Sequence, residues 1–173
     1  MALTLYAATV PSYRQILGSV AGLLTKAEAF CTEHNLAPAQ LIEARLASDM
    51  FPFSFQIRST AGHSIGAIEA LRRGSFSPDR SPLPETFGAL EELVAGAERA
   101  LGALEPEELE TLGQREVLFI AGERRLAFTG EDFLLSFAQP NFYFHATTAY
   151  DILRFKGVPL AKCDFLGQLR LKR

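Results

Sequence analysis

Three histidines are the residues of this sequence whose chemistry could define a site. They are His34, His63 and His145, and the chain adds two cysteines, Cys31 and Cys163. Imidazole binds metal ions and exchanges protons near neutral pH. A zinc site, however, needs three or four nitrogen, oxygen or sulfur ligands at once. The first question is therefore which of these side chains can meet. His34 follows a long apolar repeat, where a solvated helix end is expected.

His145 lies on the inward face of a predicted helix. At ~100° per residue it shares that face with apolar side chains before and after it. These are Leu135, Ala138, Phe142, Ala149 and Ile152. The imidazole is therefore expected to point at the core or into a cavity. A hydrogen-bonded structural histidine and a ligand-binding histidine both remain open interpretations.

His63 falls in a second predicted helix, over residues 52–73. The apolar face of that helix is expected at Ile57, Ala61, Ser64, Ile65 and Ile68. His63 would lie ~120–140° away from this face, so we expect its ring not to converge with His145. Gln56 and Thr60 lie nearer the inner edge. The sequence therefore offers one inward histidine, and His63 is not expected to be a metal ligand.

Helical periodicity dominates the elements that must position these residues. Further helices are predicted from about Val10 to Phe30, over 39–46, over 85–101 and over 129–156, where Pro140 should kink or break the helix. Residues 115–128 alternate like a hairpin around Gly122-Glu123. The fold class predicted is mainly all-α: a four-helix bundle with a short β-hairpin before the last long helix. A single domain over residues 1–173 is expected.

The amino-acid composition limits the classes of partner that this protein is expected to bind. The 173 residues are 48% hydrophobic and carry a net charge of −3. This balance argues against a nucleic-acid partner, because phosphate binding favours clustered positive charge. No apolar stretch is free enough of polar residues to span a bilayer, so no membrane partner is expected. The start lacks a secretory signal and two cysteines cannot form a disulfide framework, so a bacterial cytoplasmic location is predicted.

Other catalytic motifs fail on spacing. The run Gly62-His-Ser-Ile-Gly66 has neither the glycine spacing nor the lysine of a phosphate loop. The chain has no Gly-x-Ser-x-Gly elbow and no Cys–His signature. A nucleophilic or nucleotide-dependent enzyme is therefore not indicated by local motifs.

An aromatic run covers residues 141–150 on nearly all sides of the predicted last helix. Tyr143 and Tyr150 lie opposite His145, so this helix is expected to be buried on both faces. Either the hairpin or a second subunit would cover the far face. Aromatic residues with a polar tip are favoured at interfaces, and we expect a homodimer, with core packing as the alternative.

Two longer signatures resemble a known family. They are Asn141-Phe-Tyr-Phe-His-Ala-Thr-Thr-Ala-Tyr150 with its continuation to Gly167, and Leu46-Ala-Ser-Asp-Met-Phe-Pro-Phe-Ser-Phe-Gln-Ile57. The sequence resembles an uncharacterised bacterial domain-of-unknown-function family in the DinB/YfiT-like superfamily of proposed metalloenzymes. The resemblance implies a four-helix bundle that is usually dimeric. It covers nearly the whole chain.

The same resemblance implies a metal site that this sequence has in part. Superfamily relatives bind a divalent metal through three histidines, two of them as His-x-x-x-His on the last helix. His145 matches the first of the pair, but Ala149 stands at the second position. No cofactor is therefore assigned; zinc or nickel is the divalent ion to consider, with His145 as its ligand.

The function predicted is a dimeric small-ligand-binding or stress-related protein with a degenerate metal site. The alternative is a divalent-metal-dependent enzyme of the thiol-dependent transferase or isomerase type. Catalytic residues are not assigned. The predicted pocket is built from five polar side chains, namely His145, Gln56, Asp49, Tyr143 and Thr60.

Overall fold

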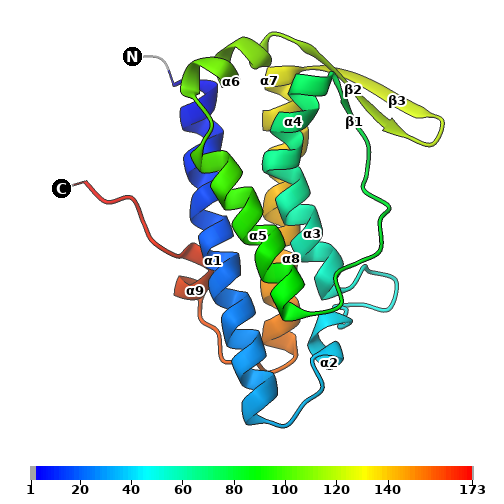
Figure 1. The fold of residues 1–173 in the computed structure, drawn as a ribbon, viewed down its shortest axis with the longest axis vertical. Coiled ribbons are helices and arrows are strands. Elements are labelled where there is room, and N and C mark those ends of the chain that lie inside the picture. The colour runs from blue at the N-terminus through cyan, green and yellow to red at the C-terminus, as the bar shows by residue number, and fades with distance from the viewer. Residues whose placement is uncertain (1–2, 173) are drawn as a thin grey trace.

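The computed structural model describes residues 3–172, and its first long element is α1 (Leu5–Glu33) (Figure 1). The helix begins five residues before the predicted start at Val10. Its N-cap is Thr4, whose hydroxyl accepts a hydrogen bond from the backbone N–H of Ala7. At the other end Asn35 takes a positive φ of 54°, which ends the helix where the sequence predicted.

The predicted single helix over 52–73 is wrong, because the segment forms two helices, α3 (Phe53–His63) and α4 (Ile65–Arg73). Ser64 between them has φ −99° and ψ −95°, outside the α region. Its hydroxyl donates to the carbonyl of Ala61 at 2.9 Å and thereby competes with the helical pattern. The chain reaches α3 from α1 through a connection that holds the short helix α2 (Ala39–Ile42).

The third long helix, α5 (Phe87–Gly102), agrees with the predicted one and packs on α1. Thr86 caps it by accepting from the backbone N–H of Ala89 at 3.2 Å. Next, α6 (Pro106–Gly113) crosses the end of the bundle towards the sheet (Figure 1).

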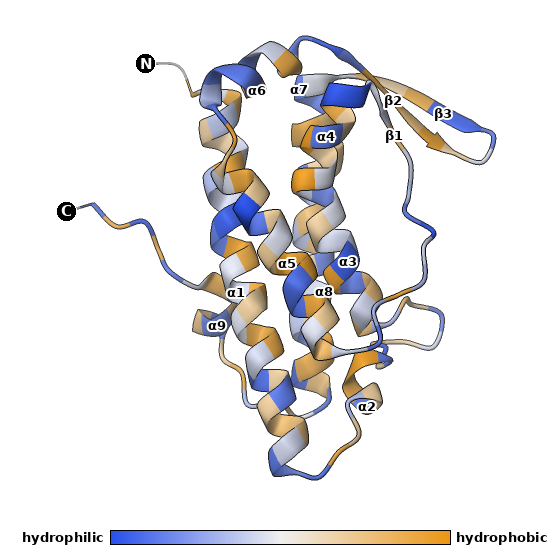
Figure 2. Ribbon diagram, in the orientation of Figure 1, coloured by the Kyte–Doolittle hydropathy of each residue, from blue (hydrophilic) through white to orange (hydrophobic). Residues whose placement is uncertain are grey.

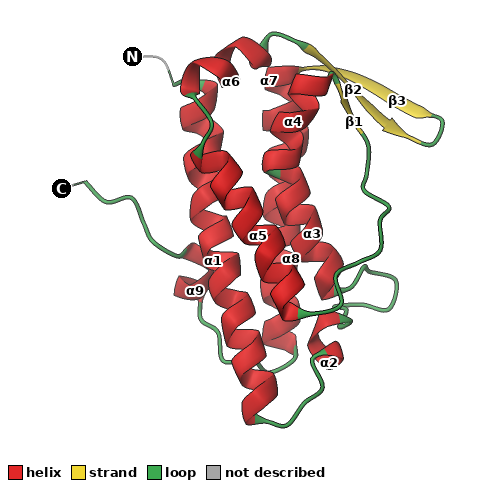
Figure 3. Ribbon diagram, viewed as in Figure 1, coloured by secondary structure: helices red, strands yellow, loops and turns green. Residues whose placement is uncertain are grey.

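The predicted hairpin is confirmed as β2 (Glu116–Ala121) and β3 (Arg124–Thr129), which pair antiparallel. Gly122 supplies the positive φ of 61° that its tight turn needs. A third strand, β1 (Ser75–Phe76), pairs parallel to β2, so the sheet order is β1–β2–β3 (Figure 3). No strand is predicted here from the sequence, because two residues are too few to show an alternating pattern.

The last helical segment changes its winding before Pro140, as the sequence predicted for a kink or break. It runs as α7 (Gly130–Asp132), the π-helix η1 (Phe133–Ala138) and α8 (Gln139–Phe155). A π-helical turn holds more residues than an α-helical one and so rotates the face of the residues before it. Leu135 is therefore 37% exposed, whereas Leu134 is buried. The prediction that Leu135 shares the inner face with His145 is wrong for this reason.

The core lies between α1, α3, α5 and α8, with α9 (Lys162–Leu166) packed on the outside of α1. Hydrophobic and hydrophilic residues mix along each helix, as expected for amphipathic helices that bury one face (Figure 2). Tyr13 of α1 and Phe142 of α8 meet in this core with ring centroids 4.7 Å apart. Within residues 3–172, no helix has the length and apolar character needed to cross a membrane.

Candidate functional site

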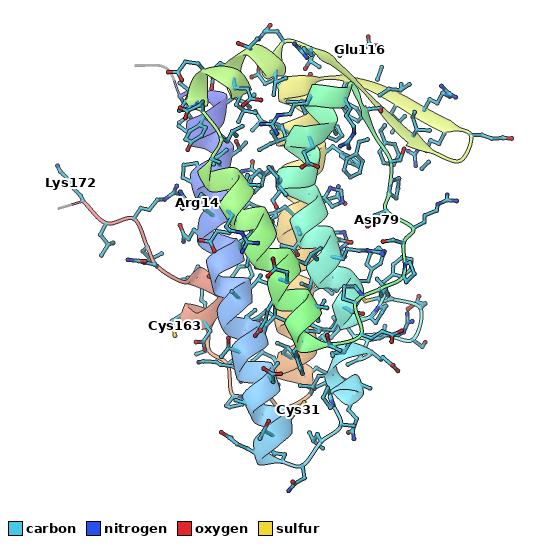
Figure 4. The ribbon with its side chains drawn as sticks, viewed as in Figure 1. Arg14, Cys31, Asp79, Glu116, Cys163 and Lys172 are labelled. Carbon is cyan, nitrogen blue, oxygen red and sulfur yellow. The ribbon has the colours of Figure 1, made fainter. Side chains whose placement is uncertain are left out.

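A cavity of about 570 Å³ lies where α3 and α4 face the start of α8, under the sheet. Its walls include Phe55, Phe76, Phe119 and Phe137 together with His63 and His145. We call it the histidine cavity. Its volume falls within the ~300–1,000 Å³ of ordinary small-molecule sites. Asp79 also lines it, on the connection that follows β1 and on the opposite side of the view from Cys163 and α9 (Figure 4).

The two histidines come together in this cavity. The ring centroids of His63 and His145 are 5.5 Å apart and the ring planes differ by 13°. The prediction that these rings do not converge is therefore wrong. The error comes from the helical wheel of residues 52–73, which treated two helices as one. The inward face derived from this wheel lay too far round the helix from His63.

Gln56 and His63 lie seven residues apart in α3, so they share one face of the helix. That face packs along α8. A polar stripe of Gln56, Thr60 and His63 thus runs beside the apolar stripe that the sequence analysis selected. The seven-residue spacing was the signal that could have found it.

Gln56 sets the tautomer of His145. Its side-chain amide Nε2 donates to the carbonyl oxygen of Phe51 at 3.0 Å, so its Oε1 is the free acceptor. This Oε1 lies 2.7 Å from Nδ1 of His145. Because the amide oxygen can only accept, Nδ1 of His145 carries the proton and Nε2 carries a free lone pair. Thr60 is buried next to this pair, and its hydroxyl donates to the backbone carbonyl of Gln56 at 2.8 Å.

His63 has the opposite arrangement. Its Nδ1 is buried and has no hydrogen-bond partner among the described residues 3–172. An N–H placed there would be left unpaired, whereas a lone pair is the smaller loss, so the proton belongs on Nε2. Aromatic rings surround the imidazole: Phe76 at 5.3 Å and Phe137 at 5.6 Å between centroids, in addition to His145.

Both imidazoles are uncharged at neutral pH. Burial, together with a smaller effect of the neighbouring His145, lowers the pKa of His63 to about 3. Burial likewise lowers the pKa of His145 to about 4. Within the described chain, neither Nε2 is among the buried polar atoms without a partner, and neither makes a protein hydrogen bond. Both Nε2 atoms are therefore accessible from the cavity that the rings line.

Charged side chains at the edge of the histidine cavity balance one another. Nη1 of Arg73 lies 3.7 Å from Oε2 of Glu69. Nη1 of Arg58 donates to the carbonyl of Ser81 at 2.6 Å. Hydrogen bonds from Ser81 lower the pKa of Asp79 and keep it ionised. Two cations and two anions thus line the cavity, and its formal charge with neutral imidazoles is zero.

The predicted pocket residues do not all lie in one place. His145 lines the histidine cavity and Gln56 contacts it. Asp49 is exposed in the connection before α3. Tyr143 is half-buried and lines a separate shallow hollow with Met50 and Asp151. Neither Asp49 nor Tyr143 is among the cavity's lining residues.

The part of the site that η1 supplies is not among the residues predicted from the sequence. Phe137 and Asn141 both line the histidine cavity. Asn141 Nδ2 donates to the carbonyl of Phe137 at 2.8 Å, which bridges η1 and α8 across Pro140. π-Helical turns are frequent at functional sites. Pro140 inside a helical pattern was the available signal.

A second hollow of about 1010 Å³ lies between α1 and the C-terminal segment, and we call it the α1 groove. Its lining includes Arg14, Gly22 and Cys163. Arg14 and Cys163 lie on the side of the molecule where the C-terminal segment leaves α9 (Figure 4). The groove has no histidine in its lining within the described part of the chain, and it lacks the aromatic walls of the histidine cavity.

A metal ion of the superfamily type does not fit the donors present. His63 and His145 supply two nitrogen donors, fewer than the three or four protein ligands that zinc takes. Over residues 3–172 no group of three or more histidine, cysteine, aspartate or glutamate side chains lies close enough to hold an ion. Ala149, at the expected second position of the pair, is buried and carries no donor.

The helical bundle and its small sheet belong to a known structural class. The chain is similar to a crystal structure described as a DinB family member protein from Shewanella denitrificans. The two are 27% identical with a TM-score of 0.83, over 98% of this chain and 95% of that one. The fold is therefore DinB-like, which confirms the predicted fold class.

The family follows from the sequence match. A family described as Domain of unknown function (DUF1993) matches residues 5–166. The chain belongs to this family, which confirms the resemblance drawn from its two signatures. A comparison with curated proteins gives no match.

Proposed function

We propose that this protein binds a small, uncharged organic molecule in the histidine cavity and holds no resident metal ion. The observation that carries the proposal is the cavity of about 570 Å³, with aromatic walls and two adjacent uncharged imidazoles. Mostly apolar walls with a few converging polar groups are typical of small-molecule sites. The balanced charges at the edge favour an uncharged occupant over an ion.

The alternative is a divalent-metal-dependent enzyme. The observation in its favour is that each imidazole keeps an accessible Nε2, and that Gln56 orients His145 as outer ligands often orient metal-bound histidines. Against it stands the number of donors, since a third ligand would have to come from the substrate or solvent. Metal content therefore separates the two functions.

The test uses a library of small aromatic and aliphatic compounds and ligand-observed NMR. Gly62 lines the cavity, and a Cβ there would meet no atom within 4 Å. Gly62→Leu therefore fills the cavity without a backbone clash. Gly22→Leu is the matched control, because Gly22 also has no atom within 4 Å but lies in the α1 groove. We expect compounds that bind the wild type to lose binding in Gly62→Leu and to keep it in Gly22→Leu.

Two results would contradict the proposal. One is a set of bound compounds that Gly62→Leu does not displace. The other is about one equivalent of zinc or nickel per chain in protein purified without an affinity tag, which would support the metal-dependent alternative. His145→Ala would then be expected to remove the metal.

The proposed function includes association of two copies of the chain into a homodimer. Phe51 and Phe144 are 59% and 57% exposed on neighbouring elements, and exposed aromatic side chains favour contact with a partner. We expect sedimentation to give the mass of a homodimer and Phe144→Ser to shift it towards the monomer. A monomeric wild type would contradict this part. The stress-related role and the cytoplasmic location stay predictions from the sequence.

A further inference from the structure

The two imidazoles present different hydrogen-bonding groups to the histidine cavity. His145 offers the lone pair of Nε2, because Gln56 holds its proton on Nδ1. His63 offers an N–H at Nε2, because its Nδ1 is sealed without a partner in the described chain. One acceptor and one donor thus lie side by side. A ligand group that both donates and accepts would satisfy them together.

A single hydroxyl group has this property. An oxygen that donates to one nitrogen and accepts from another, at ~2.8 Å each, bridges two atoms up to ~5.6 Å apart. The ring centroids of His63 and His145 are 5.5 Å apart with nearly parallel planes, and both rings line the same cavity. The proposed bridge requires the two Nε2 atoms to lie within the span of one oxygen. An ether oxygen can only accept, and a carboxylate can only accept as well, so neither would satisfy His145.

The rest of the cavity indicates what carries the hydroxyl. Phe76, Phe119 and Phe137 form a connected set of rings, with centroids 5.0–6.2 Å apart. His63 packs into this set against Phe76 and Phe137. Faces and edges of aromatic rings favour another flat ring over a branched aliphatic group. The zero formal charge of the lining disfavours a charged substituent.

We infer that the occupant is an uncharged aromatic alcohol of the phenol type, with its hydroxyl bridging Nε2 of His145 and Nε2–H of His63. This inference rests on the proposed function and adds the ligand class to it. Gln56 is a positioning residue, since it fixes which nitrogen of His145 receives the hydroxyl proton. Thr60 supports Gln56 through its backbone carbonyl.

The experiment compares three probes that share one ring system and differ in one group. They are 2-naphthol, its methyl ether 2-methoxynaphthalene, and 2-naphthoate, each titrated by its own fluorescence at neutral pH. We expect 2-naphthol to bind about tenfold more tightly than the ether, because the ether leaves the buried acceptor of His145 unpaired. The carboxylate should bind more weakly than 2-naphthol as well.

Variants assign the preference to the residues. His145→Phe keeps an aromatic ring but removes the acceptor, so 2-naphthol should lose its advantage over the ether. Gln56→Met removes the group that fixes the tautomer and should reduce the advantage, while affinity for the ether stays unchanged. The ether thereby reports that the cavity is intact in each variant. His34→Phe is the control, because His34 is exposed at the end of α1.

A direct readout needs no ligand. Two-bond ¹⁵N–¹H correlation spectra of the histidine rings distinguish the two neutral tautomers. We expect a protonated Nδ1 at His145 and a protonated Nε2 at His63. The reverse assignment at His145 would overturn the inference, whatever binds.

The binding results separate this inference from the proposed function. Equal affinity for 2-naphthol and its ether, with both excluded by Gly62→Leu, would overturn the phenol class and leave a ligand cavity. Tightest binding of 2-naphthoate would overturn the uncharged class. If no probe binds in the cavity, the inference fails, and the compound library then decides the proposed function.

Discussion

Tyr13 and His63 are two buried polar side chains in very different surroundings. In residues 3–172, the hydroxyl of Tyr13 and Nδ1 of His63 are the buried side-chain nitrogen and oxygen atoms without a hydrogen-bond partner. Both side chains pack against α8, Tyr13 on Phe142 and His63 on His145, three residues further along. One helix therefore supports both regions within a single turn.

The two side chains differ in what the rest of each side chain contacts. Tyr13 is fully buried in the closed core, and burial raises the pKa of its hydroxyl. Its unpaired oxygen can only lower stability. His63 lines a cavity, and its second nitrogen is accessible there. The unpaired atom lowers stability in both regions, but His63 also presents a second nitrogen, Nε2, to a cavity where a ligand can bind.

The largest expected effect separates core from cavity by truncation. Phe142→Ala should lower the free energy of unfolding by about 3–5 kcal/mol, because the ring is fully buried and leaves a new void. Phe137→Ala should cost about 1–2 kcal/mol less, because Phe137 is half-buried and already borders a hollow. Urea denaturation of both variants measures the difference. Equal losses would mean that the cavity wall is packed as tightly as the core.

The next effect is the pH dependence of stability from the two imidazoles. In the folded protein the pKa of His63 is about 3 and that of His145 about 4, against an ordinary value of 6.5. The unfolded chain therefore binds more protons below pH 6.5. The contribution of the neutral imidazoles to the free energy of unfolding is complete above pH 6.5. It is lost as the pH drops from 6.5 towards 4. We expect a loss on the order of 2 kcal/mol from each imidazole over this window.

The measurement is urea unfolding near neutral pH and at about pH 4.5. The double variant His63→Phe/His145→Phe should lose less stability between these values than the wild type. His34→Phe, which removes an exposed histidine, should behave as the wild type does. A double variant with the wild-type pH profile would show that carboxylates alone cause the loss.

The contrast also explains which parts of the molecule the sequence could predict. The bundle is built from long apolar repeats, such as the one that includes Leu17 and Leu24 in α1. Each repeat defines a single apolar face on a helical wheel. The hairpin could be predicted equally well, because Gly122 marks its turn and apolar and polar residues alternate in the segments on either side, which form β2 and β3. Helix ends were harder to predict: the Thr4 cap lies six residues before Val10, where the predicted helix begins.

The site was harder, because it depends on departures from regular geometry. Ser64 breaks α3 from α4, and η1 adds a residue to its turn before Pro140. The break at Ser64 separates the inner face of α4 from that of α3, so a single wheel over both helices placed His63 on an outer face. Within α3 alone, His63 lies on the face of Gln56 and meets His145. The sequence predicted an inward His145 and placed Gln56 in the same predicted pocket. It could not place Phe76 or Phe119, which arrive through pairing of β1 with β2.

The smallest effect tests the comparison itself. Tyr13→Phe should raise the free energy of unfolding by about 1 kcal/mol, because it removes an unpaired hydroxyl and keeps the ring that packs on Phe142. It should leave the affinity of 2-naphthol unchanged, since Tyr13 does not line the cavity. His63→Phe should instead weaken the binding of both 2-naphthol and its ether, because both oxygens accept the N–H of His63, and it should leave the preference that His145 sets. Destabilisation by Tyr13→Phe, measured by urea unfolding, would show that the hydroxyl has a bound water in solution. The core around Tyr13 would then hold a water molecule, and the histidine cavity would differ from it in binding a ligand.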